Sequence, residues 1–235
     1  ARAVLCVILM PCMIIDAHSH AWEVWPYDPP VPDPASRARV EQLLHEMDVN
    51  GVSQAILVSA NIAHNPENNA YVAEQVKRYP KRLHQFADVD SFWSVTYHAS
   101  GAADRLNVAA ARYPMTGFTH YLKENDDGSW LYSDEGNKFF KAAADLKLIA
   151  SLSCYPHQQP AIRNVAERNP SLPILIHHLG HPKVVQKEQL EQVLASAEHP
   201  NIYLKLSGFY YATAGPKWDF PYHDTHDTVC ALFGA

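Results

Sequence analysis

The chain has 235 residues, of which 47% are hydrophobic and 19% charged, and its formal net charge is -6. This length allows one large α/β domain or two small ones, with enough apolar residues for a sizeable core. The negative charge argues against nucleic acid or an anionic membrane as a partner, and no apolar run reaches the roughly 18 residues of a membrane span.

The four cysteines lie far apart in the sequence and form no Cys-x-x-Cys pair. This spacing disfavours both a disulfide framework and a structural zinc knuckle. Cysteines without disulfide partners are typical of a reducing compartment, so we expect a cytoplasmic protein. The four are Cys6, Cys12, Cys154 and Cys230.

Residues 1–12 are largely apolar, do not begin with methionine and directly precede Met13. They are compatible with a clipped signal-peptide core, an extra strand, or upstream sequence read in frame. The lack of a small-residue cleavage site weakens the signal-peptide interpretation. We therefore expect Met13 to be the natural start, residues 1–12 to be an N-terminal extension outside the native protein, and residues 13–235 to form an incomplete (β/α)8 domain.

Short apolar runs with strand-like composition alternate with stretches of helical periodicity. The predicted strands are residues 13–20, 54–60, 83–90, 117–122, 148–154, 173–179 and 202–208. The predicted helices are residues 36–49, 68–79, 102–113, 134–146, 161–168, 183–196 and 223–233. Several helices end at a residue before proline, which is pushed out of the α region.

Strict β-α alternation predicts a parallel sheet, either doubly wound or closed into a (β/α)8 barrel. No Gly-x-Gly-x-x-Gly follows the first strand, which counts against a dinucleotide or phosphate-binding site. Candidate functional residues instead follow several different strands, as in a TIM barrel. Only seven strands are predicted, so we expect a (β/α)8 TIM-barrel type fold, apparently truncated before strand 8.

The first strand carries His18 and His20, two residues apart. Alternation places Asp16, His18 and His20 on one face, with the imidazoles about 7 Å apart along the strand. Such a pair can converge on one metal ion or one substrate. The alternative is a pair of ordinary histidines in a half-buried strand.

Further histidines follow strands five and six. His157 lies just past strand five, where it can lean over the barrel mouth or remain an ordinary loop residue. Strand six ends in His177 and His178, and alternation predicts that only one of them faces the centre. That one could orient or deprotonate a water, since its pKa lies near neutrality, or it could be a core histidine.

Other residues near the strand ends are candidates for the pocket wall. His120 and Tyr121 end strand four, Tyr211 follows strand seven, and Trp22 follows strand one. Aromatic residues at such places are also common as simple packing. A serine triad is disfavoured because no Gly-x-Ser-x-Gly is present, and Cys154 in an apolar strand is more often inert than nucleophilic.

Taken together, four segments resemble the amidohydrolase-related family (amidohydrolase 2) of the metal-dependent hydrolases. They are Asp16 to His20, Cys154 to Pro160, His178 to Pro182, and Lys205 to Gly208. The resemblance implies a TIM barrel in which His18, His20 and His157 bind one divalent metal, zinc in many members, and His178 activates water. In metal-free lactonases of the family the same histidines would polarise the carbonyl.

The resemblance implies a hydrolase acting on a lactone, or on a related ester or amide, with a small-molecule carboxylate or lactone as substrate. The alternatives are a zinc-dependent non-oxidative decarboxylase of an unsaturated carboxylic acid, or an inactive metal-binding fragment. Two departures from the family are visible. Many members carry Asp where this chain has His177, and the acidic residue expected on strand eight is absent from this sequence.

Overall fold

The computed structural model describes residues 13–28 and 31–235, so the expectations for residues 1–12 lie outside the described residues. Seven strands form one parallel sheet in chain order from β1 to β7. Each overlaps a strand predicted from the sequence. The strands are β1 (Ile15–Ser19), β2 (Gln54–Val58), β3 (Leu83–Asp88), β4 (Met115–Tyr121), β5 (Ile149–Ser153), β6 (Ile174–Ile176) and β7 (Ile202–Leu204).

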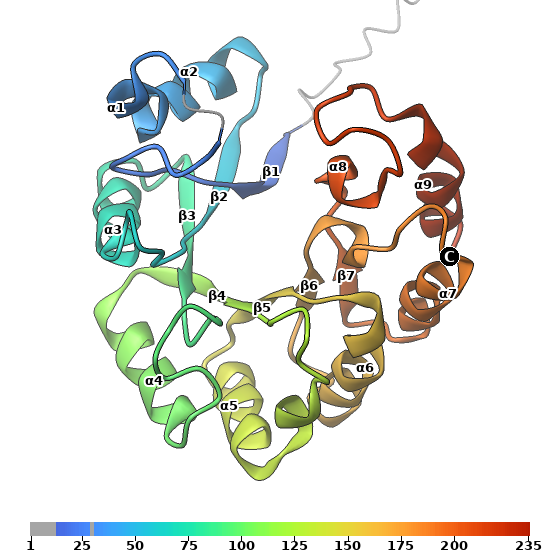
Figure 1. Ribbon diagram of the computed structural model, residues 1–235. Helices are drawn as coiled ribbons and strands as arrows, with labels where there is room; N and C mark the ends of the chain where they lie inside the picture. The colour runs from blue at the N-terminus through green and yellow to red at the C-terminus, as the bar shows by residue number, and fades with distance from the viewer. Residues whose placement is uncertain (1–12, 29–30) are drawn as a thin grey trace, which may run out of the picture.

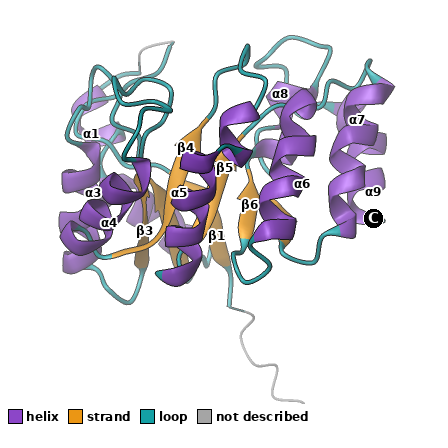
Figure 2. Ribbon diagram, turned by 90° about the horizontal axis from the view of Figure 1, so that it is seen from below, coloured by secondary structure: helices purple, strands orange, loops and turns teal. Residues whose placement is uncertain are grey.

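Helices follow the strands and lie around the outside of the sheet (Figures 1 and 2). Within the described segments, none of them is both long and apolar enough to cross a membrane. The α-helices are α1 (Pro34–Arg37), α2 (Val40–Val49), α3 (Asn68–Arg78), α4 (Ala102–Arg112), α5 (Asp134–Asp145), α6 (Gln159–Arg168), α7 (Lys187–Leu194), α8 (Phe209–Ala212) and α9 (His226–Phe233). The 3-10 helices are η1 (Ser129–Tyr132), η2 (Pro156–Gln158), η3 (His178–Gly180), η4 (Ala195–Glu198) and η5 (His223–Thr225).

The sheet curves into an incomplete ring in which β1 and β7 are the two edge strands of the described residues (Figure 1). This architecture confirms the prediction of a (β/α)8-type barrel with seven strands in this chain. Because all strands are parallel, their carboxyl ends meet at one rim, which is where such barrels carry their functional residues.

The main core lies between the outer face of the sheet and the helices. On β4, Phe118 points outward and meets Phe139 of α5, with ring centroids 5.1 Å apart at 84°. Alternation then sends its neighbours Thr119 and Tyr121 to the inner face of the ring. Packing of the outer face thus determines which β4 side chains reach the interior.

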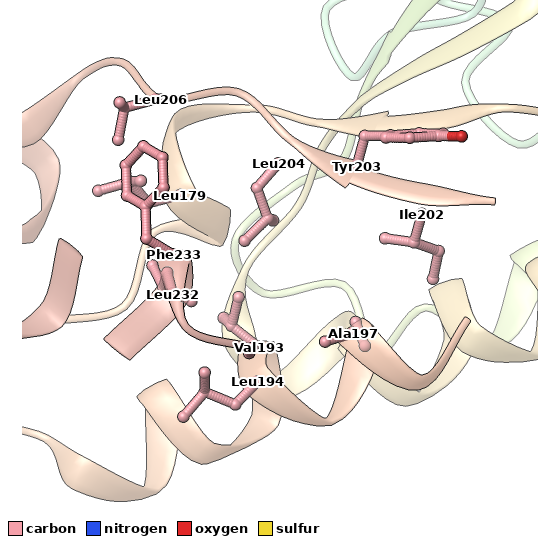
Figure 3. Close-up of a pocket in the computed structure, with 12 residues that line it drawn as sticks. Leu179, Val193, Leu194, Ala197, Ile202, Tyr203, Leu204, Leu206, Leu232 and Phe233 are labelled. Atoms are coloured by element: carbon pink, nitrogen blue, oxygen red, sulfur yellow. The ribbon is translucent and has the colours of Figure 1, made fainter. Parts of the chain in front are cut away.

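An apolar cavity of about 370 Å³ lies between β7, α7 and α9 (Figure 3). Leu204, Val193 and Phe233 are among its lining residues, and it includes no histidine or carboxylate side chain. This cavity therefore belongs to the packing between β7 and its neighbouring helices, and it lacks the groups needed for acid–base chemistry.

Candidate active site

A second cavity, of about 450 Å³, opens beyond the carboxyl ends of the strands. It combines aromatic walls with several groups that form hydrogen bonds, a combination typical of small-molecule sites. Its lining residues are Phe92, Tyr121, Leu122, Glu124, Ser153, Tyr155, Pro156, His157, His178, His181, Lys183, Gln189 and Tyr211.

The rings of His18, on β1, and His20, just after it, lie next to one another with centroids 5.0 Å apart. The Nε2 atoms of His18 and His20 are 3.2 Å apart, and Nδ1 of His20 is 2.7 Å from the carbonyl oxygen of Val58. A carbonyl only accepts, so Nδ1 of His20 carries the proton and its Nε2 carries a lone pair. Burial lowers the pKa of His20 to about 4, which keeps this ring neutral near pH 7.

Strand six brings both of its histidines to the same place. One ring nitrogen from each of His18, His177 and His178 lies within 4.8 Å of the other two. The expectation that only one of His177 and His178 faces the centre is therefore wrong. Alternation holds only within a strand, and β6 already ends at Ile176.

The backbone after β6 turns sharply in the left-handed region. His178, Leu179, Gly180 and His181 all have positive φ, between 48° and 76°. Left-handed conformations of residues other than glycine are strained and often occur at functional sites. This turn shortens the predicted strand and directs His178 toward β1.

The segment after β7 holds His178 in position. The Oγ atom of Ser207 is 2.9 Å from Nδ1 of His178. Gly208 has φ 62°, and a Cβ added there would lie 2.6 Å from the same Nδ1. A glycine is therefore required beside the imidazole, which explains two positions of the Lys205 to Gly208 motif.

Lys205 is buried inside the ring and links β1 with β5. Its Nζ atom lies 3.3 Å from Nδ1 of His18 and 2.7 Å from Oγ of Ser151. Burial lowers the pKa of Lys205 to about 7, although Asp16 partly offsets this effect. Ser151 is also 2.7 Å from Nε2 of His177, so a continuous hydrogen-bonded path joins His18 to His177.

His181 and Tyr211 complete the wall beside His178. Their ring centroids are 4.8 Å apart, and Tyr211 lies 4.9 Å from His178. Tyr211, a candidate for the pocket wall from the sequence, lines this cavity. Tyr121 also lines it, with its ring 5.0 Å from that of His177.

Three other residues singled out in the sequence lie outside the group of His18, His177 and His178. His157 lies in η2 on the pocket wall, exposed, with Nε2 3.0 Å from the carbonyl oxygen of Asp126, and it is not in the group of three histidines. Trp22 is buried and stacks on His20 at 5.2 Å. Cys154 is buried, and burial raises its pKa to about 12, which fits an inert thiol.

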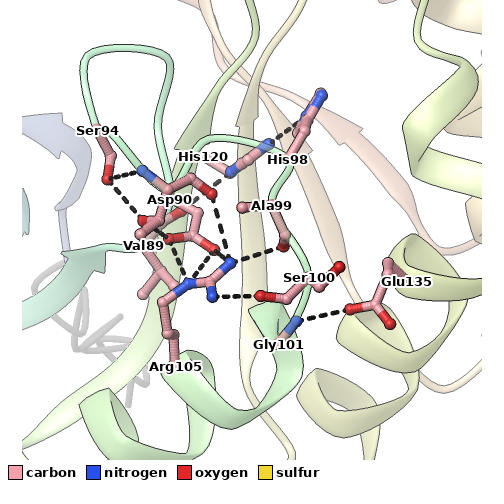
Figure 4. A network of polar contacts seen from close by, with 11 residues as sticks. Val89, Asp90, Ser94, His98, Ala99, Ser100, Gly101, Arg105, His120 and Glu135 are labelled. Atoms are coloured by element: carbon pink, nitrogen blue, oxygen red, sulfur yellow. Dashed lines mark hydrogen bonds and ion pairs between the residues drawn. The ribbon is translucent and has the colours of Figure 1, made fainter.

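His120 belongs to a separate stacked cluster, formed by Tyr97, His98, His120 and Trp130. His120 lies outside the pocket lining; its Nδ1 is 3.0 Å from the carbonyl oxygen of Val89, and its Nε2 is 3.3 Å from Nε2 of His98 (Figure 4). His98 and Trp130 stack at 4.2 Å and 5°. Both nitrogens of His120 are thus engaged by protein groups.

The sequence model of the amidohydrolase family matches residues 15–230. The chain belongs to the amidohydrolase family. Among curated proteins, it is similar to the L-fucono-1,5-lactonase of Burkholderia ambifaria, with 27% identity over 237 residues that cover 94% of this chain and 76% of that protein.

Solved structures of amidohydrolases share the fold. A probable 2-pyrone-4,6-dicarboxylic acid hydrolase from Acinetobacter baumannii, with citric acid bound, has a TM-score of 0.69 at 19% identity, covering 94% of this chain and 78% of that one. An amidohydrolase from Burkholderia multivorans with bound zinc has a TM-score of 0.69 at 16% identity. The match covers 95% of this chain and 79% of that one. At these identities the likeness shows the TIM-barrel fold.

The sequence assigned no role to Ser151, His181 or Lys205, and it left open which of His177 and His178 faces the centre. Lys205 had a visible signal, since a lysine between two leucines of a strand interrupts an apolar run. Ser151 had none, because a serine in a buried strand is common. His181 lies in a His-Pro pair, which indicates a turn but no chemistry.

Proposed function

We propose that this amidohydrolase hydrolyses a lactone, by attack of water on the ring carbonyl. The observation that carries the proposal is the group of His18, His177 and His178, whose nitrogens lie within 4.8 Å of one another next to a 450 Å³ cavity. Similarity to a lactonase favours a lactone over an amide or another ester.

We further propose that His18, His20 and His177 hold one divalent metal, with zinc the first candidate. Nδ1 of His177 is buried and has no hydrogen-bond partner among the described residues. The 3.2 Å between Nε2 of His18 and Nε2 of His20 is close to the roughly 3.3 Å separating two nitrogen ligands of one tetrahedral zinc. The donor set thus fits zinc, which supplies Lewis acidity to a carbonyl and lowers the pKa of water toward about 7.

The protein's own residues would bind the substrate and accept the proton of the attacking water. His178 faces the pocket, and a hydrogen bond from its Nδ1 to Ser207 leaves a lone pair on Nε2 that can accept a proton from water. Burial and neighbouring His181 lower the pKa of His178 to about 3, which keeps that lone pair free at neutral pH. The contact between Nζ of Lys205 and Nδ1 of His18 orients the ring of His18.

The pocket wall would hold the ring of the lactone. Tyr121, Tyr211 and His157 line the cavity, and Trp22 supports His20 from behind. In a metal-free version of the mechanism, the histidines themselves would polarise the carbonyl.

Cys154 and Cys230 carry free thiols, which fits the expected cytoplasmic location.

The test is hydrolysis of five- and six-membered lactones by the full-length natural protein, followed as proton release, before and after metal removal. We expect turnover that disappears on metal removal and returns with zinc. Turnover that persists without metal would favour the metal-free mechanism. Release of CO2 from an unsaturated carboxylic acid, without lactone hydrolysis, would replace the proposal with a decarboxylase.

A further inference from the structure

His181 is the one pocket-lining histidine with a buried and unpartnered ring nitrogen among the described residues. Its side chain lines the cavity, the residue is only 9% exposed, and its Nε2 atom has no hydrogen-bond partner there. A buried polar atom without a partner is costly unless a ligand or water satisfies it. Because the side chain that carries this atom lines the cavity, a ligand group bound there is its nearest candidate partner.

The contact of Nδ1, the other ring nitrogen of His181, determines whether the ligand group at Nε2 donates or accepts a hydrogen bond. Nδ1 of His181 is 3.1 Å from the backbone carbonyl oxygen of Cys154. Because the carbonyl can only accept, Nδ1 must carry the proton. Burial lowers the pKa of His181 to about 4, so the ring holds a single proton at neutral pH. Nε2 is then an acceptor and cannot donate.

The charges around the cavity agree with a neutral donor on the ligand. Lys183 is the one lysine or arginine among the lining residues, and its Nζ atom already donates to the carbonyl oxygen of Tyr211. Glu124 contributes a carboxylate to the same wall, which would repel an anion. The rings of Tyr155 and Tyr211 lie beside His181 at 5.2 and 4.8 Å and offer apolar faces.

We infer that His181 is a specificity-determining residue whose Nε2 accepts a hydrogen bond from a hydroxyl group of the substrate, so that the pocket selects a hydroxylated lactone over a carboxylated one. This inference rests on the proposed lactone hydrolysis and adds the substrate class. A site built to pair with a substrate hydroxyl discriminates strongly against the analogue that lacks it, since its own polar atom is then left unpaired.

The experiment uses the full-length protein and a six-membered sugar lactone in which each hydroxyl is replaced by hydrogen in turn. For the unmodified protein we expect kcat/KM to fall roughly tenfold at one ring position, as for one lost hydrogen bond. His181→Phe should abolish the preference at that position only, and His181→Gln, whose amide oxygen can accept, should restore part of it. His45→Phe, at an exposed histidine, is the matched control.

Binding of the corresponding lactams, measured by calorimetry, separates this inference from the proposed function. If no lactone is hydrolysed but lactam binding shows the same hydroxyl preference, the inference stands and the proposed reaction fails. An equal loss for every analogue in His181→Phe would overturn the inference. It would also be overturned by a preference for a carboxylated lactone that disappears in Lys183→Met.

Discussion

Two histidine clusters, each with one member on a strand of the sheet, differ in how their ring nitrogens are satisfied. In the pocket cluster (His18, His20, His177, His178 and His181), the structure leaves Nδ1 of His177 and Nε2 of His181 without partners among the described residues. In the stacked cluster, both nitrogens of each histidine lie within 3.3 Å of a polar partner.

Left-handed backbone occurs beside both clusters, since Asp90 and His98 also have positive φ, of 53° and 56°. The pocket cluster depends on a left-handed turn at positions 178–181. The stacked cluster is adjacent to a network in which Arg105 binds both oxygens of Asp90 and the carbonyl groups of Ser100 and Ala99 (Figure 4). The two clusters therefore differ in their unpartnered ring nitrogens, which occur among the described residues in the pocket cluster only.

The largest expected effect is in the pocket cluster. We expect His18→Ala in the full-length protein to lower kcat/KM for lactone hydrolysis at least ~10³-fold and to remove bound metal. Metal content is measured by elemental analysis alongside turnover. His45→Ala, at an exposed position, should change neither. Full activity in His18→Ala would contradict the assignment of the site.

The network beside the stacked cluster is expected to affect stability instead. Arg105→Met leaves the carboxylate of Asp90, whose side chain is only 4% exposed, without its cation. We expect the free energy of unfolding to fall by about 3 kcal/mol, because an unpaired buried charge is costly. Urea denaturation measures this change. Lys141→Met, which removes an exposed ion pair, is the control and should change stability by less than about 1 kcal/mol.

The pH dependence of stability tests the neutral state of His181. Its pKa is about 4 in the folded protein against 6.5 for an ordinary histidine, so between these values the unfolded state binds the extra proton. The resulting stability is present above pH 6.5 and is lost as the pH falls to about 4, by about 3 kcal/mol. The stability difference between the natural protein and His181→Gln should shrink by this amount between pH 7 and pH 4. A difference independent of pH would show that His181 titrates normally.

The smallest effect is expected for His120 in the stacked cluster. His120→Phe keeps the ring but leaves the Val89 carbonyl oxygen and Nε2 of His98 without this partner. We expect a loss of about 2 kcal/mol in the free energy of unfolding, with kcat/KM unchanged within about twofold. A large loss of kcat/KM with unchanged stability would restore the sequence-based prediction that His120 binds substrate.

Much of this protein follows from local sequence patterns. Apolar periodicity predicted all seven strands, because strand and helix formation depends mainly on the spacing of apolar side chains. Alternation also placed His18 and His20 on one face, and the segment Lys205 to Gly208 was one of four that resemble the family. These features depend on residues that are neighbours in the chain.

Only the tertiary structure decided which histidines meet and which protons they carry. Lys205 reaches His18 across 187 positions of sequence and Ser151 across 54, distances at which no local pattern operates. The left-handed turn after β6 brings both His177 and His178 to His18 and directs His181 to the cavity. The carbonyl oxygens of Val58 and Cys154 then determine the protonated nitrogens of His20 and His181, because hydrogen bonding in a buried site depends on long-range packing.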